Sequence, residues 1–143
     1  MVHILHNARV IISGSRDFDR PKLLRAKLDK YLVWMDRPNI CTGGQRQKIG
    51  VRRWIGADYF GELWAHQWHF LVSIFHADWQ QYGKAAGMIR NREMVNYAAE
   101  EGNGYAVFFW DGSSPGTKHT MDLAKKAGLK VRVVYYLEED CDE

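Results

Sequence analysis

The chain has 143 residues, 46% of them hydrophobic, and a formal net charge of +3 at pH 7. This length supports one globular core, so we predict a single domain over residues 1–143. The small net charge excludes a surface built throughout to bind nucleic acid. No apolar stretch approaches the roughly 20 residues of a membrane span, and the N-terminus lacks a signal-peptide pattern, so we expect no membrane partner.

The number of cysteines indicates the cellular compartment, and two segments of the chain carry a local charge. The chain has two cysteines, Cys41 in an apolar run and Cys141 in an acidic one, which is too few for a disulfide framework. A reducing, cytoplasmic setting is therefore the expectation. Residues 44–55 form a basic insertion with four cations and no acid, and residues 138–143 form an acidic tail predicted to be solvated.

Strand-like and helix-like segments alternate along the chain. Short apolar runs rich in β-branched and aromatic residues predict strands over 9–13, 39–42, 70–75, 105–110 and 131–137. Apolar residues at helical spacing predict helices that begin after an Asp19 cap, near Gly56, near Lys84 and at Pro115, the last stopping at Gly128. Strict alternation of this kind predicts an α/β fold with a mainly parallel sheet of about five strands and helices on both faces.

The helical spacing also predicts the buried faces. In the first helix the apolar positions are Leu23, Leu24, Leu28, Tyr31 and Leu32. One face of the second helix carries Phe60, Leu63, Trp64 and Trp68. The third helix is predicted to bury Ala85, Met88, Val95 and Ala98.

The segment 111–117 is the most informative motif, because it joins a predicted buried strand to a predicted helix. Ser114 can cap that helix, and Pro115 fits its first position, where the missing N–H costs nothing. Gly116 lets backbone donors approach a ligand, and Thr117 adds a hydroxyl beside the free N–H groups of the first turn. The motif is compatible with a phosphate site and equally with a well-capped turn.

Glycines and polar residues follow four of the predicted strands where each strand ends. In a parallel sheet these carboxyl ends share one edge, and ligands bind at the point where the strand order changes direction. We therefore predict a ligand pocket at this edge. The residues expected around it are Gly14, Ser15 and Arg16; Gly43 and Gly44; Asp78 and Trp79; and Asp111 through Thr117, with Gly112 and Ser113 among them.

Several short phrases along the chain carry a family resemblance. In order they are Ser13-Gly14-Ser15-Arg16-Asp17-Phe18, Gly56-Ala57-Asp58, Ala77-Asp78-Trp79, Tyr82-Gly83-Lys84-Ala85-Ala86-Gly87, Arg90-Asn91-Arg92-Glu93-Met94 and Gly116-Thr117. Together they resemble the YspA-like family of the SLOG superfamily, which includes the "lonely guy" phosphoribohydrolases and DprA. The resemblance implies a Rossmann-like three-layer domain and a nucleotide or ADP-ribose-like ligand. Some members of the superfamily cleave an N-glycosidic bond, and others only sense a ligand.

The resemblance also implies which residues contact the ligand. They are Gly14, Ser15 and Arg16 in the first loop, Arg90 and Asn91 on the third helix, and Gly116 and Thr117 at the phosphate. The residue chemistry agrees, because arginine offers a planar fork of donors to phosphate, and asparagine can both donate and accept at a base or ribose edge. For Arg90, a solvated helix face paired with Glu93 is the alternative.

Two departures from the family pattern bear on activity. The phosphoribohydrolases carry a glutamate three residues after the threonine of their Gly-Thr pair, where this chain has Thr120. A glycosidase needs a carboxylate, so hydrolysis would have to use Asp58, Asp78 or Asp111 as the catalytic residue. The other departure is the insertion 44–55, which is predicted to cover the pocket mouth as a basic, aromatic lid made of Arg46, Lys48, Arg52, Arg53 and Trp54.

Three functions remain open from the sequence. Binding of a nucleotide-type small molecule is favoured by the missing glutamate, and an N-glycosidase acting on a nucleoside monophosphate or nucleotide derivative is the alternative. A DNA-binding accessory protein ranks last, because the basic charge is too local for a surface that follows a phosphate backbone. We expect no cofactor and no metal site, since His66 and His69 lack a third ligand at zinc-type spacing. A homo-oligomer remains an option.

Overall fold

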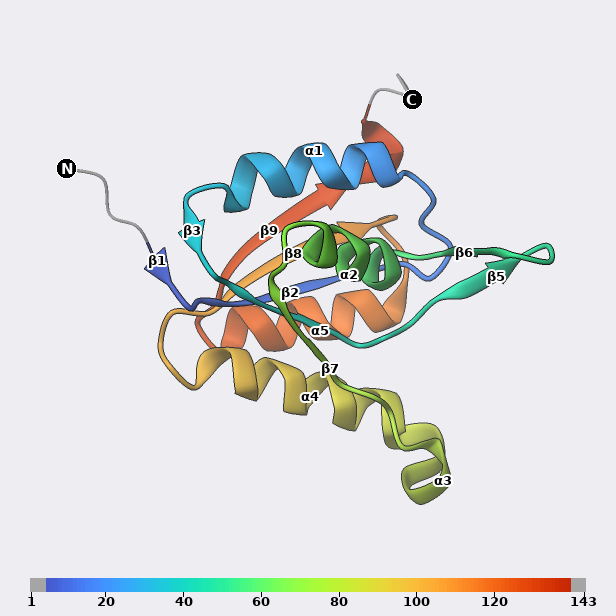
Figure 1. The fold of residues 1–143 in the computed structure, drawn as a ribbon. Helices are drawn as coiled ribbons and strands as arrows, with labels where there is room; N and C mark the ends of the chain where they lie inside the picture. The colour runs from blue at the N-terminus through green and yellow to red at the C-terminus, as the bar shows by residue number, and fades with distance from the viewer. Residues whose placement is uncertain (1–4, 140–143) are drawn as a thin grey trace.

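A five-stranded parallel sheet forms the centre of the molecule (Figure 1). The computed structural model describes residues 5–139. The strands follow the spatial order β7-β4-β2-β8-β9, and every neighbouring pair is parallel. Their bounds are Arg9–Gly14 (β2), Asn39–Thr42 (β4), Leu71–Ile74 (β7), Tyr105–Trp110 (β8) and Lys130–Tyr135 (β9). Because the first of these strands lies in the middle, the strand order changes direction between β2 and β8.

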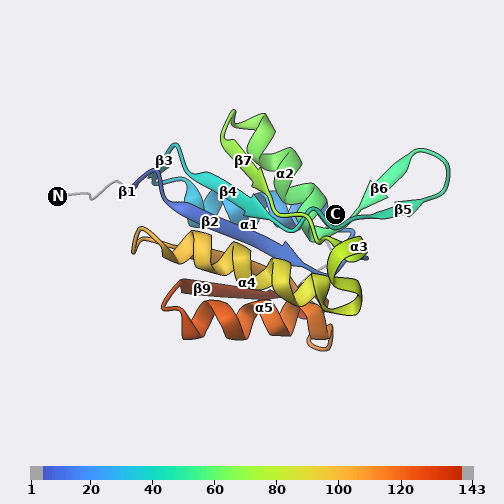
Figure 2. The same ribbon diagram turned by 90° about the horizontal axis from the view of Figure 1, so that it is seen from below.

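Helices cover both faces of the sheet (Figure 2). Helices α1 (Pro21–Leu32) and α2 (Ala57–Gln67) lie on one face, and α4 (Ala86–Ala99) and α5 (Pro115–Lys126) lie on the other. This arrangement confirms the predicted α/β fold, a Rossmann-like three-layer domain with a parallel sheet.

The alternation of side chains along the central strands divides the interior into two cores. In β2, Val10 and Ile12 belong to the core beneath α1 and α2, and Ile11 belongs to the core beneath α4 and α5. In β8, Val107 and Phe108 divide in the same way. Successive residues of a strand point to opposite faces, so a strand covered on both sides must be apolar throughout. This is why the apolar runs predicted these strands correctly.

Each helix contributes one apolar stripe to these cores. Leu24, Leu28 and Leu32 of α1 recur every four residues and are almost fully buried. In α2, Gly61 allows a close approach to the sheet, because a Cβ atom there would lie 2.7 Å from Cγ2 of Ile12.

The remaining elements are short. Strands β1 (Leu5–His6) and β3 (Met35–Asp36) pair with each other, and β5 (Gln47–Ile49) and β6 (Arg53–Ile55) form an antiparallel hairpin within the insertion 44–55. Helix α3 (Trp79–Tyr82) and a 3-10 turn (Gly83–Ala85) precede α4, and a second 3-10 turn (Tyr136–Glu138) follows β9. The hairpin and α3 extend from the same end of the sheet (Figure 2).

The predicted cap of α1 is wrong. The helix begins at Pro21 with Arg20 at the N-cap position and no side-chain cap bond. Asp19 instead forms a two-bond ion pair with Arg53 of the hairpin. The carboxylate therefore joins two segments 34 residues apart rather than capping its own helix. The local sequence around Asp19 does not show this distant contact.

Several predicted core positions are in fact exposed. Met88 is 53% and Trp68 is 52% exposed, and Ala85 is also exposed. Residues 79–88 extend beyond the sheet, so the face that would be buried in mid-helix meets solvent there (Figure 1). The third strand is also shorter than predicted and lies at the sheet edge, where Leu71 is 67% exposed.

The ends of the chain are described only in part. Of the acidic tail, Glu138 ends a 3-10 turn and Glu139 pairs with Lys27, while residues 140–143, including Cys141, lie outside the described residues. Cys41 is fully buried, and burial raises the pKa of its thiol to about 12. No helix within residues 5–139 combines the length and apolar character needed to cross a membrane.

We predict that Gly14→Ala destabilises the fold. A Cβ atom at Gly14 would lie 2.2 Å from the carbonyl oxygen of Phe109 and 2.7 Å from Cβ of Ala57, so β2, β8 and α2 would have to separate. Overpacking of this kind costs roughly 1–3 kcal/mol. Urea unfolding should show this loss in Gly14→Ala but not in Gly116→Ala, because a Cβ at Gly116 meets no atom within 4 Å. Equal stability of the two variants would contradict the close packing.

Candidate functional site

The main pocket lies at the carboxyl ends of the central strands. It has a volume of about 410 Å³ and is lined by the end of β2, the loop after β4, the start of α2, α3 with the 3-10 turn after it, the first half of α4 and the start of α5. This is the point where the strand order changes direction, which is where open parallel sheets bind ligands. A hollow of this size fits a drug-sized or mononucleotide-sized molecule.

The loop between β8 and α5 is fixed by its own side chains. The carboxylate of Asp111 accepts hydrogen bonds from the backbone N–H groups of Ser113 (2.9 Å) and Ser114 (2.7 Å) and from the Ser114 hydroxyl (2.7 Å). Burial raises the pKa of Asp111, but these hydrogen bonds outweigh burial and hold it below the ordinary value. The N-terminus of α5 is thereby held in one place, with Gly116 and Thr117 lining the pocket.

The first turn of α5 presents donors to the pocket. Pro115 occupies the first helical position, and backbone N–H groups in a first turn have no acceptor within the helix. Such N–H groups, with the positive end of the helix dipole, favour an anion. The hydroxyl of Thr120 donates to the carbonyl of Gly116 at 3.2 Å, so this side chain is engaged by the helix itself.

Asp58 is a buried carboxyl on the pocket wall. It is 3% exposed, and its Oδ2 accepts hydrogen bonds from the N–H groups of Gly43 (3.1 Å) and Gln45 (3.2 Å). Its Oδ1 is buried with no hydrogen-bond partner among the described residues. Burial raises the pKa of Asp58 to about 7, even though the Gln45 N–H and the Arg90 charge act in the opposite direction. Near neutral pH this carboxyl can therefore hold or release a proton.

Arg90 and Asn91 bring α4 into the site. Arg90 is 5% exposed; its Nη1 donates to the carbonyl of Gly43 (2.7 Å), and its Nε donates to Oδ1 of Asn91 (2.8 Å). Nδ2 of Asn91 lies 3.3 Å from Nδ1 of His119 on α5. Burial lowers the pKa of Arg90, and Asp58 partly opposes that shift. An arginine nevertheless remains charged, so the pocket wall contains a buried cation.

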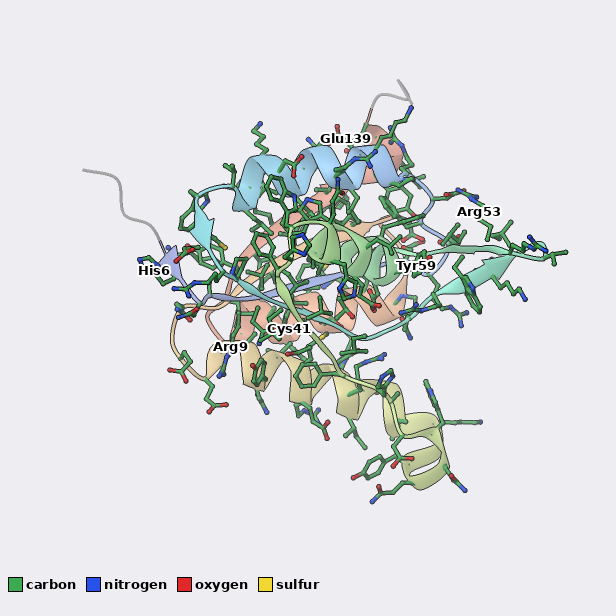
Figure 3. The ribbon with its side chains drawn as sticks, in the orientation of Figure 1. His6, Arg9, Cys41, Arg53, Tyr59 and Glu139 are labelled. Atoms are coloured by element: carbon green, nitrogen blue, oxygen red, sulfur yellow. The ribbon has the colours of Figure 1, made fainter. Side chains whose placement is uncertain are left out.

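A second network fastens the base of the hairpin. Glu62 of α2 accepts hydrogen bonds from the Thr42 hydroxyl (2.7 Å) and from Nη2 of Arg46 (2.6 Å). The guanidinium of Arg46 also lies 4.9 Å from the ring centre of Tyr59. Figure 3 labels Tyr59 on α2 and Arg53 on the hairpin. Together with the ion pair between Arg53 and Asp19, these contacts hold the hairpin against the body of the domain.

A second hollow, which we call the hairpin recess, lies between the hairpin and α3. Its volume is about 530 Å³, and its lining includes Arg16, Arg46, Trp54, His76 and Trp79. None of the five predicted lid residues lines the main pocket. Arg46 and Trp54 line the recess instead, Arg53 is paired with Asp19, and Lys48 lies 5.8 Å from the ring centre of Trp54.

The predicted site residues divide into three groups. The residues that line the main pocket are Gly14, Gly43, Asp58, Arg90, Asn91, Gly116 and Thr117. Arg16 and Gly44 line the hairpin recess. Neither hollow is lined by Ser15, Asp78, Asp111, Gly112 or Ser113. In this last group, Asp78 caps α3 by accepting from the Gln81 N–H, and the Ser15 hydroxyl lies 3.1 Å from that of Ser114.

Sequence reasoning missed several lining residues. Gln45, Lys84 and Met88 line the main pocket but were not predicted as site residues. Lys84 lies within the phrase 82–87 used for the resemblance, so that phrase could have identified it. Met88 was predicted to be buried in the core from its helical spacing. This prediction was wrong because helical spacing does not show where a helix extends beyond the sheet.

Comparison with known proteins gives the family. Residues 8–82 match the model of the YspA, cpYpsA-related SLOG family. The chain is also 36% identical over 129 residues to the Gene 61 protein of Mycobacterium phage D29, an alignment that covers 86% of this chain and 93% of that protein. The chain belongs to the YspA, cpYpsA-related SLOG family. This confirms the resemblance found in the sequence.

The buried carboxyl generates a prediction about pH. Between its ordinary pKa of 3.8 and about 7, the folded chain keeps a proton on Asp58 that the unfolded chain has released. Stability contributed by this group therefore falls as pH rises through that window and stays low above it. Asp58→Asn, which is neutral at every pH, should gain stability relative to the wild type at pH 8 but much less at pH 5.

Urea unfolding of both proteins at the two pH values measures this difference. Because the two chains differ at position 58 alone, the change in their stability difference between the two pH values reports on Asp58. A stability difference that is the same at pH 5 and pH 8 would show that Asp58 has an ordinary pKa in the folded chain.

Proposed function

We propose that the main pocket binds a nucleotide-derived small molecule, with a phosphate at the first turn of α5. The main support for this proposal is that the α5 N-terminus, Arg90, Asn91 and Asp58 all line one pocket of about 410 Å³. The backbone donors and helix dipole favour a phosphate. Asn91 and Asp58 can make hydrogen bonds to ribose hydroxyls or a base edge.

The charge balance of the pocket also favours an anion. Lys84 and Arg90 line it, and Asp58 is the one acidic side chain among the described residues that line it. Since burial holds the pKa of Asp58 near 7, this carboxyl is in part neutral at physiological pH. Membership of the SLOG family adds support, because the superfamily is associated with nucleotide-related ligands.

Gly116→Val should weaken nucleotide binding and leave the fold intact. A Cβ atom at Gly116 meets no atom within 4 Å, and Gly116 lines the pocket, so a valine there should take up pocket volume beside the donors of the first turn. Calorimetry with a panel of nucleotides should show an affinity at least about tenfold lower, equivalent to roughly 1.4 kcal/mol.

Ala127→Val is the matched control, since it enlarges an exposed, uncharged residue at the C-cap position of the same helix. Its nucleotide affinity should match that of the wild type. An unchanged affinity of Gly116→Val for every nucleotide that the wild type binds would rule out the phosphate position.

One observation favours a second function, cleavage of an N-glycosidic bond. Asp58 lines the pocket, and a carboxyl with a pKa of about 7 can act as a general acid or base near neutral pH. In such a reaction water attacks C1′ of the ribose, the C–N bond breaks, and the base leaves with a proton. Thr120 carries no charge to stabilise the oxocarbenium-like centre, so binding remains the main proposal.

One assay, the release of free base, distinguishes the two functions. We expect no release of free base when the wild type is incubated with nucleoside monophosphates or ADP-ribose and the products are separated by chromatography. If turnover occurs, Asp58→Asn should reduce it by at least about a hundredfold, as loss of a general acid or base does, while Asp78→Asn, at a residue outside the main pocket, should keep it. Turnover that disappears in Asp58→Asn would replace the binding proposal with the glycosidase.

The structure gives little support to the alternative that the chain binds DNA. Arg46 and Arg53 of the insertion are paired with Glu62 and Asp19, so their charge is largely compensated. A DNA-binding surface needs several cations free to neutralise phosphates.

A further inference from the structure

We infer that β7 is the interface for a second copy of this chain, which pairs with it strand to strand in the antiparallel direction. The two copies then share one continuous sheet, with their β7 strands side by side at its centre. This inference concerns an edge of the sheet, and it is independent of the ligand proposed for the main pocket.

β7 is an open edge of the sheet (Figure 2). Within residues 5–139 it pairs with β4 alone, and β9 forms the opposite edge. Leu71 is 67% and Ile74 is 38% exposed, so neither end of the strand is covered. An edge strand carries unpaired backbone N–H and C=O groups, which are a template for another strand.

The two edges of the sheet differ in charge. Natural proteins protect open edges with charged residues, especially lysine, or with proline. β9 carries Lys130 and Arg132, and both are exposed. Residues 68–77, which include β7, contain no Lys, Arg, Asp, Glu or Pro. Two copies of β9 would bring like charges together, whereas two copies of β7 meet without this repulsion. The charge pattern therefore selects β7 as the edge that accepts a second copy.

The backbone of β7 determines which residues can pair. The N–H of Phe75 donates to the carbonyl of Thr42 in β4. Residues that bond to one neighbouring strand alternate with residues that face the other side, so Val72 and Ile74 direct their N–H and C=O groups outward. An antiparallel pair centred on Ser73 places Val72 opposite Ile74 of the second copy, where the two residues exchange hydrogen bonds. The outward groups of β7 are thus complementary to themselves under a two-fold rotation.

The same register brings apolar side chains together. Leu71 of one copy lies opposite Phe75 of the other, on the face of the sheet that carries α4, because Phe75 packs beside Tyr97 of that helix. On the other face, where Val72 packs against the core beneath α1 and α2, Val72 lies opposite Ile74. Cross-strand pairs of aromatic and β-branched residues stabilise antiparallel sheets.

The size of the exposed apolar surface indicates a reversible dimer. β7 has four residues, and Trp68, which is 52% exposed and stacks on Phe70, extends its apolar surface. A standard interface buries roughly 800 Å² per partner, and weak or transient interfaces bury less. We therefore expect a dimer whose population depends on the concentration of the chain.

Sedimentation equilibrium over a range of chain concentrations tests for this dimer. The wild type should pass from monomer to dimer as its concentration rises. Leu71→Lys should weaken dimerisation by at least about tenfold, because a two-fold interface contains the substituted residue twice and places each lysine opposite an apolar side chain. Val33→Lys is the matched control, since it introduces the same charge at a 74% exposed position outside β7. It should dimerise as the wild type does.

Ile74→Pro tests the backbone pairing separately. The N–H of Ile74 faces outward, and proline is tolerated at such positions of an edge strand, so the bonds between β7 and β4 should remain. Circular dichroism should show a wild-type fold, and sedimentation should show a monomer. If Ile74→Pro does not fold, the comparison of Leu71→Lys with Val33→Lys decides.

Amide hydrogen exchange followed by NMR locates the interface. The N–H groups of Val72 and Ile74 should exchange more slowly at high than at low chain concentration, whereas those of Ser73 and Phe75 should be protected at both. A wild type that stays monomeric at about 1 mM would overturn the inference. A dimer that Leu71→Lys does not weaken, or one that leaves exchange at Val72 and Ile74 unchanged, would overturn it as well, because that dimer would use another surface.

Discussion

The structure around the pocket depends on how the loop after β4 is held between the two helical layers. From one layer, the carboxyl of Asp58 accepts the N–H groups of Gly43 and Gln45. From the other layer, Arg90 donates to the carbonyl of Gly43. A Cβ atom at Gly43 would lie 2.9 Å from Nη1 of Arg90 and 3.1 Å from Oδ2 of Asp58, so glycine is needed for both bonds to form. The same three residues thus join the layers and line the main pocket.

This arrangement places two ionisable groups in a region that penalises their charged forms. Burial raises the pKa of Asp58 and lowers the pKa of Arg90. Each group is partly stabilised by the other, but Oδ1 of Asp58 has no partner among the described residues. A fold optimised only for stability would replace such groups with apolar ones. Under the proposed function, a molecule bound in the main pocket would supply the interactions that these two groups lack.

The sequence was sufficient for the features that depend on local pattern. β2 and β8 were predicted because both their faces are buried and their sequences are therefore apolar throughout. α5 was predicted from Ser114 and Pro115 at its start and Gly128 at its end. The pocket position followed from the rule for parallel sheets, so Gly14, Gly43 and Gly116 could be named in advance.

Features that depend on distant contacts could not be predicted in this way. The sequence treated Asp58, Asp78 and Asp111 as equivalent, because all three lie near strand ends. In the structure they differ through their partners: Asp111 holds its own loop, Asp78 caps a short helix, and Asp58 lines the pocket. The cap assigned to Asp19 failed for a similar reason, since its partner, Arg53, lies 34 residues away.

The insertion shows how an addition to a fold can reach the ligand site without disturbing it. Its first cation, Arg46, bonds to Glu62, and Glu62 also binds the Thr42 hydroxyl at the end of β4. The Thr42 hydroxyl in turn accepts the N–H of Gly44, in the loop that Asp58 and Arg90 hold. The hairpin is therefore anchored to the same short loop that shapes the main pocket. A segment anchored there lies beside the main pocket whatever sequence its tip carries, so the tip can change while the buried bonds that hold the layers together stay the same.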